Sequence, residues 1–164
     1  MAHSVNIKAV GDALVSYLSS NLTSLGLVSC SWVAGMRSEP VYPANPRTDC
    51  PLLRLRLYTA DLAPGTVKQS TDVTMQASLY YYRRQTAGQA HQTLLLSALE
   101  TIAELFTGDW RPSGIEALPG IALYSVVPRQ MVIHDEMPHP LGDDPAMRVS
   151  VGELVLVITY RSNA

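Results

Sequence analysis

The chain has 164 residues, of which 47% are hydrophobic and 16% are charged, and its formal net charge is −2. This length and composition favour one folded domain over a disordered chain, and the charge gives no general attraction to nucleic acid or to an anionic membrane. No stretch reaches the roughly 20 apolar residues of a membrane span, and the N-terminus lacks the pattern of a signal peptide. We therefore expect a protein that is made and kept in the cytoplasm, or assembled there.

The cationic side chains are nearly all arginine, with ten arginines against two lysines. Arginine suits bidentate and stacked contacts at protein interfaces, whereas lysine mainly keeps a free surface soluble. The two cysteines, Cys30 and Cys50, lack the spacing of a zinc or thioredoxin motif. Such cysteines are most often free, buried residues of a reducing compartment, and a disulfide between them is the alternative.

The first part of the chain predicts a helix followed by a short strand. Apolar residues recur at helical spacing over residues 5–25, with Ser4 or Asn6 able to cap the start and Gly26 placed to end the helix. Residues 27–33 then predict a short strand. Residues 35–51 contain four prolines, which exclude a helix or a central strand and indicate an extended arm or loop.

Two segments, residues 52–58 and 73–84, alternate between apolar and other side chains and therefore predict long strands. The segment between them, residues 59–72, is longer than a tight hairpin needs and is expected to be a protruding loop. The faces of the two strands that do not carry the leucines are rich in arginine and tyrosine: Arg54, Arg56, Tyr58, Tyr80, Tyr82 and Arg84.

The clearest helix covers residues 90–108, where a continuous apolar stripe ends at Gly108. Residues 121–134 predict one strand interrupted near Pro128 by a bulge or bend, because proline cannot donate a hydrogen bond to the ladder. The last strand is expected over residues 147–161. Its part from residue 154 to residue 158 is apolar on both faces, as in a strand that is covered on both sides.

This order of elements predicts an α+β fold, in which two helices pack on one face of an antiparallel sheet of four to five strands. The chain is expected to form a single domain with three long extended loops, at residues 35–51, 59–72 and 135–147.

The sheet face without helices is predicted to mediate contacts between subunits. Its arginines and tyrosines are residue types enriched at interfaces, and Tyr160 is expected to join them. Leu154, Leu156 and Ile158 of the last strand need a cover that no remaining helix supplies, which favours self-assembly. A plain solvated sheet face is the alternative, and a surface that stacks on single-stranded nucleic acid is a more distant one.

One polar stretch, "IHDEMPHPLGDDP", combines histidines with carboxylates. Its prolines exclude a helix, and its spacing matches neither a zinc site nor a calcium loop. We expect an acidic loop between the last two strands that contacts a partner protein, with a metal-binding or enzymatic role for residues 134–144 as the alternative. We predict no catalytic residue, no metal and no cofactor, because no catalytic motif is present. The candidate contact residues are Asp135, Glu136, His139, Asp143 and Asp144.

The outline of the chain resembles the tail terminator proteins of tailed bacteriophages. It has an N-terminal amphipathic helix, long sheet hairpins around a second helix, and a strand at its C-terminus, and small proteins of the head–tail connector region share much of this outline. The stretches that carry the resemblance are "LLRLRLY", "ASLYYYRR", "HQTLLLSALETIAELF" and "VSVGELVLVITYRS".

The resemblance implies a structural protein of the virion rather than an enzyme. Tail terminators form a six-membered ring at the head-proximal end of the tail tube, where they stop tube polymerisation and present a surface to the head connector. The expected partners are therefore further copies of this chain, the tail tube protein, a sheath protein if the tail has one, and the connector or stopper protein. Another neck or head-completion protein is the alternative within this class.

Overall fold

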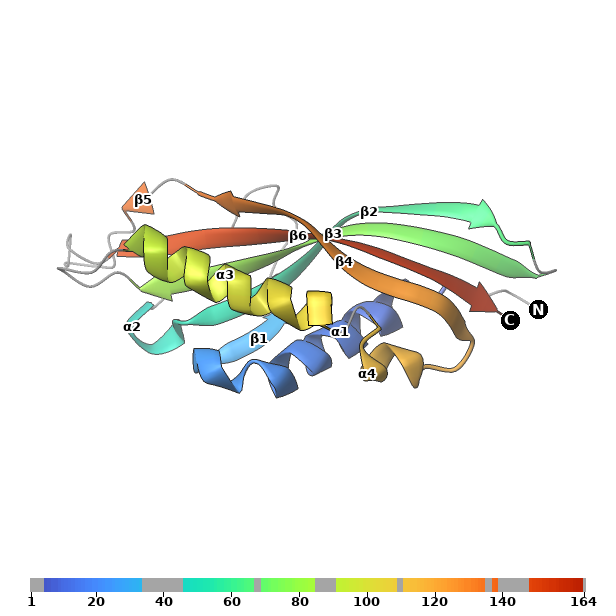
Figure 1. The fold of residues 1–164 in the computed structure, drawn as a ribbon, viewed down its shortest axis with the longest axis horizontal. Coiled ribbons are helices and arrows are strands. Elements are labelled where there is room, and N and C mark those ends of the chain that lie inside the picture. The colour runs from blue at the N-terminus through green and yellow to red at the C-terminus, as the bar shows by residue number, and fades with distance from the viewer. Residues whose placement is uncertain are drawn as a thin grey trace.

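The protein has an α+β fold in which a long twisted sheet carries its helices on a single face (Figure 1). The structure is a computed structural model, and it describes residues 5–33, 46–66, 69–84, 91–108, 111–134, 137–138 and 148–163. The predicted fold class is confirmed, including the placement of two long helices on one side of the sheet.

Among the described residues the sheet contains six strands, rather than the four to five that the sequence predicts, and it is mixed rather than wholly antiparallel. Their order is β1-β2-β3-β6-β4, and β5 pairs with β6 outside this path. All neighbours are antiparallel except β1 and β2, which are parallel. Parallel neighbours need a crossover connection, and the stretch between Trp32 and Leu52 supplies it. The strands are β1 (Ser29–Trp32), β2 (Leu52–Pro64), β3 (Ser70–Arg84), β4 (Ile121–Ile133), β5 (Met137–Pro138) and β6 (Arg148–Asn163).

The prediction of a protruding loop at residues 59–72 is wrong, because most of these residues belong to strands β2 and β3. Strands β2 and β3 stay paired up to Pro64 and Thr71, with one register shift between Leu57 and Thr59. Strand β3 is paired with β6 along its whole length, so it offers β2 a regular partner even where the sequence of β2 no longer alternates. The resulting hairpin projects beyond the helices (Figure 1).

The two long helices begin and end close to the predicted positions: α1 covers Ile7–Asn21 and α3 covers His91–Gly108. A short 3-10 turn at Thr23–Leu25 follows α1, and Gly26 ends it with a φ of 60°. Asn6 occupies the N-cap position of α1 but makes no capping bond. Its side chain instead donates a hydrogen bond to Ser162 Oγ at 3.0 Å. Two further helices, α2 (Pro46–Asp49) and α4 (Ser113–Glu116), are one turn long. The prediction that prolines exclude a helix from residues 35–51 is therefore wrong for α2, because proline is tolerated at the first position of a helix, where Pro46 lies.

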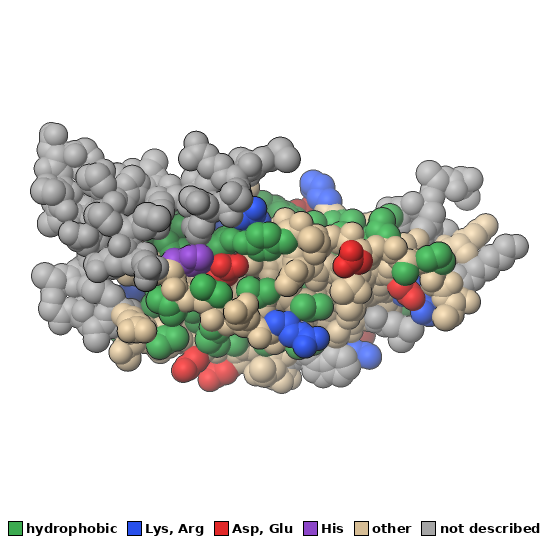
Figure 2. All heavy atoms as spheres, turned by 90° about the horizontal axis from the view of Figure 1, so that it is seen from above, with side chains coloured by type: hydrophobic (Ala, Val, Ile, Leu, Met, Phe, Trp, Pro, Cys, Tyr) green, Lys and Arg blue, Asp and Glu red, His purple; other side chains and the backbone are tan. Residues whose placement is uncertain are grey.

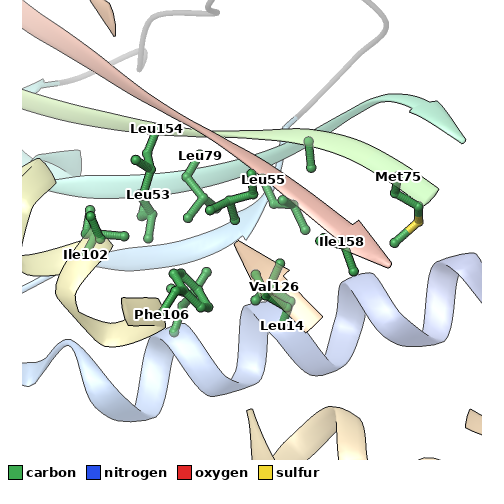
Figure 3. Close-up of a cluster of buried hydrophobic side chains, with 14 of the residues drawn as sticks. Leu14, Leu53, Leu55, Met75, Leu79, Ile102, Phe106, Val126, Leu154 and Ile158 are labelled. Carbon is green, nitrogen blue, oxygen red and sulfur yellow. The ribbon is translucent and has the colours of Figure 1, made fainter. Parts of the chain in front are cut away.

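The main core lies between the helices and the sheet (Figure 3). Helices α1 and α3 bury their apolar stripes against the leucines of β2 and β3 and against β6, and this burial is the main favourable term for the fold. The side chains that meet there include Leu14, Leu53, Leu55, Met75, Leu79, Ile102, Phe106, Val126, Leu154 and Ile158.

The predicted orientation of the last strand is wrong. Four residues of β6 that were expected on the uncovered face lie in the main core instead: Leu154, Leu156, Ile158 and Tyr160. Their partners on β3 are the core residues Leu79, Ala77, Met75 and Val73. Both faces of this stretch are apolar, so local alternation could not assign a side, and the pairing with β3 decides it. The helices already cover these residues, so they are not available to a neighbouring subunit.

A second apolar cluster lies on the other face of the sheet, towards one end. Its members are fully buried and come from β2, β3 and β6, with Val33 and Cys50 packed against them. The sheet is therefore apolar on both faces at this end. The cluster consists of Leu52, Tyr80, Tyr82, Val149 and Val151.

Gly152 lets β6 approach helix α3 closely. A Cβ atom at this position would lie 2.8 Å from Leu99 Cδ1 and 3.2 Å from Leu95 Cγ. We expect Gly152→Ala to lower the free energy of unfolding by about 1–3 kcal/mol, because overpacking a closed core is destabilising. Urea unfolding would measure the loss. Gly108→Ala, where the added Cβ meets nothing within 4 Å, is the matched control, and equal losses in the two variants would contradict this account.

Candidate functional site

The sheet face opposite α1 and α3, called the open face here, carries the arginines and tyrosines predicted from the sequence. Figure 2 shows this side of the molecule, where a histidine lies next to an acidic side chain and apolar side chains are spread among polar ones. Arg56 Cζ lies 4.3 Å from the centre of the Tyr58 ring, and Arg54 Cζ lies 5.4 Å from the centre of the Tyr82 ring. Both distances allow cation–π attraction, which orients the two arginines along the sheet.

A buried carboxylate, Glu153 on β6, is the centre of a polar cluster on the open face. Its Oε1 atom lies 2.9 Å from Nε2 of His134, the residue after β4. Its Oε2 atom accepts a hydrogen bond from Ser78 Oγ at 2.5 Å and a longer one from the Tyr58 hydroxyl at 3.4 Å. A buried charge is stable only when it is paired and hydrogen-bonded, and here β2, β3 and the end of β4 provide the partners.

Two tyrosines extend the polar cluster across β2 and β3. The hydroxyl groups of Tyr58 and Tyr80 are hydrogen-bonded to each other. Burial raises the pKa of Tyr80 above its usual value, and the hydrogen bond with Tyr58 and the charge of Glu153 act in the same direction. Tyr80 therefore stays neutral at physiological pH and serves as a hydrogen-bonding group rather than as a base.

The polar cluster contains Ser, His and Glu side chains, but it is not arranged as a nucleophile with its base. In a hydrolytic site the base must lie within hydrogen-bond reach of the nucleophile. Here the Ser78 hydroxyl is bonded to the carboxylate, which lies between it and His134. Ser78 is also fully buried. The arrangement therefore holds strands together and leaves the hydroxyl out of reach of a substrate.

The structure changes which predicted residues a partner can touch. Tyr80 and Tyr82 lie on the open face as expected, but they are fully buried and can neither anchor a neighbour nor stack on nucleic-acid bases. Arg54 and Arg56 are half-buried, whereas Tyr58 and Arg84 are exposed. The candidate loop residues Asp135, Glu136, His139, Asp143 and Asp144 lie outside the described residues.

Sequence reasoning missed the partnership of His134 and Glu153. One signal was present: Glu153 is the only charged residue in the apolar run "VGELVLVI". A carboxylate in such a strand predicts a buried ion pair or hydrogen-bonded partner. Its partner His134 follows another strand, β4, so no spacing within the sequence could identify it.

Within the described part of the chain the sheet has two open edges, and both expose apolar side chains. Strand β1 pairs with β2 only along residues 52–55, and no other described strand covers β2 beyond them or the outer side of β4. Six large apolar side chains among the described residues are exposed, and four of them lie on these two strands. They are Tyr58 (42%) and Leu62 (54%) on β2, and Val127 (37%) and Met131 (38%) on β4.

The two edges also differ in charge. Residues 57–64 of β2 contain one charged residue, Asp61, and β4 contains one, Arg129. Both are exposed, and neither forms an ion pair with another described residue. Arg129 lies at the register shift between Pro128 and Gln130, where the sequence predicted a bulge. The edges thus combine exposed apolar groups with single charges of opposite sign.

A shallow pocket lies where α1 turns into β1. It is lined by hydroxyl and apolar side chains without any charged group, and Cys30 forms part of its wall. Burial raises the pKa of Cys30 and of Cys50 to about 11, and both thiols are free. Such thiols are poor nucleophiles, so the pocket has no reactive group.

Comparison of the chain with models of protein families gives no match, and neither does comparison with curated protein sequences. Among the described residues, no group of three or more His, Cys, Asp or Glu side chains is placed to hold a metal ion. Within the same part of the chain, no helix is both long enough and apolar enough to cross a membrane.

Replacing Glu153 should destabilise the protein through the polar cluster. Glu153→Ala leaves Ser78 and His134 without their acceptor in a buried setting, so we expect a loss of about 1–3 kcal/mol in the free energy of unfolding. Glu153→Gln keeps one acceptor oxygen and the side-chain volume, and should lose less. Urea unfolding of both variants is the measurement, and an alanine variant as stable as the unmodified protein would contradict the role of the cluster.

The two thiols should react slowly in the folded protein. A pKa of about 11 leaves a thiolate fraction on the order of 0.001 at pH 8, against about 0.1 for the ordinary value of 9.0. We therefore expect labelling by a thiol reagent at pH 8 to be about 100-fold slower in buffer than in denaturant. Equal rates in the two conditions would show that the thiols are solvated.

Proposed function

We propose that the protein is a structural subunit of the phage tail-terminator type. Copies of it close into a ring, expected to have six members, that caps the tail tube, stops tube polymerisation and joins the tail to the head connector. The observation that carries the proposal is the pair of unlike sheet edges, each of which exposes apolar side chains.

Unlike edges suit a head-to-tail assembly. A two-fold dimer uses the same patch on both subunits, whereas a ring needs two different patches on each subunit. Strand β2 provides one patch with Tyr58 and Leu62, and β4 provides the other with Val127 and Met131. Exposed apolar edge strands are an aggregation hazard for a lone protein, and a closed ring removes that hazard by using both edges.

The open face supports contacts with further proteins of the particle. Arg54, Arg56 and Tyr58 have the side-chain types that are enriched at interfaces, and they lie where no described helix covers the sheet. The tail tube protein, a sheath protein if there is one, and the connector or stopper protein are the expected partners. In this proposal the mature protein is part of the virion, at the junction of tail and head, after assembly in the host cytoplasm.

The proposal predicts rings that cap tubes. Light scattering and negative-stain imaging of the purified protein should give closed rings, and the addition of a ring preparation to polymerising tail tube protein should shorten the tubes and leave rings at one end. A protein that stays monomeric with and without tubes, and that leaves tube length unchanged, would overturn the proposal.

A further inference from the structure

We propose that neighbouring copies join by strand addition, in which β2 of one copy pairs antiparallel with β4 of the next and Asp61 lies beside Arg129. This inference rests on the proposed ring and specifies its subunit interface. The occupant of each open edge is thus a second copy of this chain.

The directions of the strands allow such a junction. Strand β2 is antiparallel to β3, β3 to β6, and β6 to β4, so β4 runs opposite to β2 within one copy. If copies are related by rotation about an axis parallel to the strands, each strand runs in the same direction in every copy. The β4 strand of the neighbour would therefore meet β2 in the antiparallel sense and continue the same hydrogen-bond ladder.

Strand β1 limits the register of the junction. It occupies the edge of β2 along residues 52–55, and the Val33 amide donates a hydrogen bond to the Leu55 carbonyl at 2.8 Å. The neighbour's β4, which ends at Ile133, can therefore begin to pair with β2 no earlier than Leu57. With Ile133 opposite Leu57, Asp61 falls beside the bulge formed by Arg129 and Gln130. Both strands advance equally from the starting pair, and within this stretch each contains one irregularity.

The same register matches the faces of the two strands. Asp61 pairs with Thr74 on the open face, and Gln130 pairs with Val155 on that face as well. Leu62 and Met131 pair with the core residues Val73 and Leu154, so both point to the helix side of the sheet. A slip of one residue would place open-face side chains of one copy beside helix-side side chains of the next. The limit that β1 sets on the pairing and the pattern of side chains therefore favour the same register.

The junction accounts for the exposed groups at both edges. Leu62 and Met131 would be diagonal neighbours on the helix side of the continuous sheet, within reach of each other. Asp61 and Arg129 would gain a partner of opposite charge, which fixes the register more than it adds affinity. Pro128 removes one donor from the new ladder, and this loss falls at the bulge between Pro128 and Gln130, where proline is tolerated.

Charge reversal tests the junction. Asp61→Arg alone or Arg129→Asp alone should weaken assembly at least tenfold in the concentration needed for rings, measured by analytical ultracentrifugation, because each brings like charges together. The combined variant, Asp61→Arg with Arg129→Asp, should restore assembly to within about threefold. Glu104→Arg, an exposed acidic residue on α3, is the matched control for net charge and should assemble normally. Circular dichroism checks that each variant is folded.

A cross-link provides a second measurement that does not depend on charge. Asp61→Cys combined with Arg129→Cys should form, on mild oxidation of assembled protein, covalent multimers up to the ring, whereas either cysteine variant alone should give none beyond dimers. Two outcomes would overturn this junction and leave the proposed ring in place. In the first, rings tolerate both single charge reversals. In the second, the combined charge variant stays dissociated and the double cysteine variant does not cross-link. Failure of the unmodified protein to form any ring would overturn the proposed function itself.

Discussion

The antiparallel pairing of β3 with β6 is the interaction on which the rest of the structure depends. It runs without a register shift from Ser70 and Asn163 to Arg84 and Val149, and it joins segments that lie far apart in the sequence. This pairing turns Leu154, Leu156 and Ile158 towards the helices and Glu153 towards the open face. It also supports β2 along the projecting hairpin. The faces of the sheet, the core and the polar cluster all follow from this one register.

A buried carboxylate in the middle of such a sheet is costly unless every partner is in place. Glu153 meets that condition through His134, Ser78 and Tyr58, which come from three other parts of the sheet. Any slip between β6 and its neighbours would leave the charge without partners, so the cluster penalises wrong registers. It thus contributes to a unique sheet arrangement.

The arrangement of the sheet has two consequences for assembly. Among the described residues, α1 and α3 cover one face, and β1 covers only the start of β2, so no described strand pairs with the remaining part of β2 or with the outer side of β4. Edge strands of soluble proteins are usually blocked by charge, proline or bulges. Strand β4 has a proline and two register shifts, and β2 has one shift and a terminal proline. These devices limit indiscriminate pairing, while Leu62, Val127 and Met131 still make both edges apolar.

The sequence by itself determined the local elements, and only the tertiary structure decided how they face one another. Helices α1 and α3, the alternation of β2 and β3 and the bulge near Pro128 follow from propensity and spacing within a few residues, and they were predicted correctly. The side of β6 that meets the helices, the length of the β2–β3 hairpin and the pairing of His134 with Glu153 were not. Each of these depends on a register between strands that are distant in the sequence, and a stretch that is apolar on both faces gives no local sign of that register.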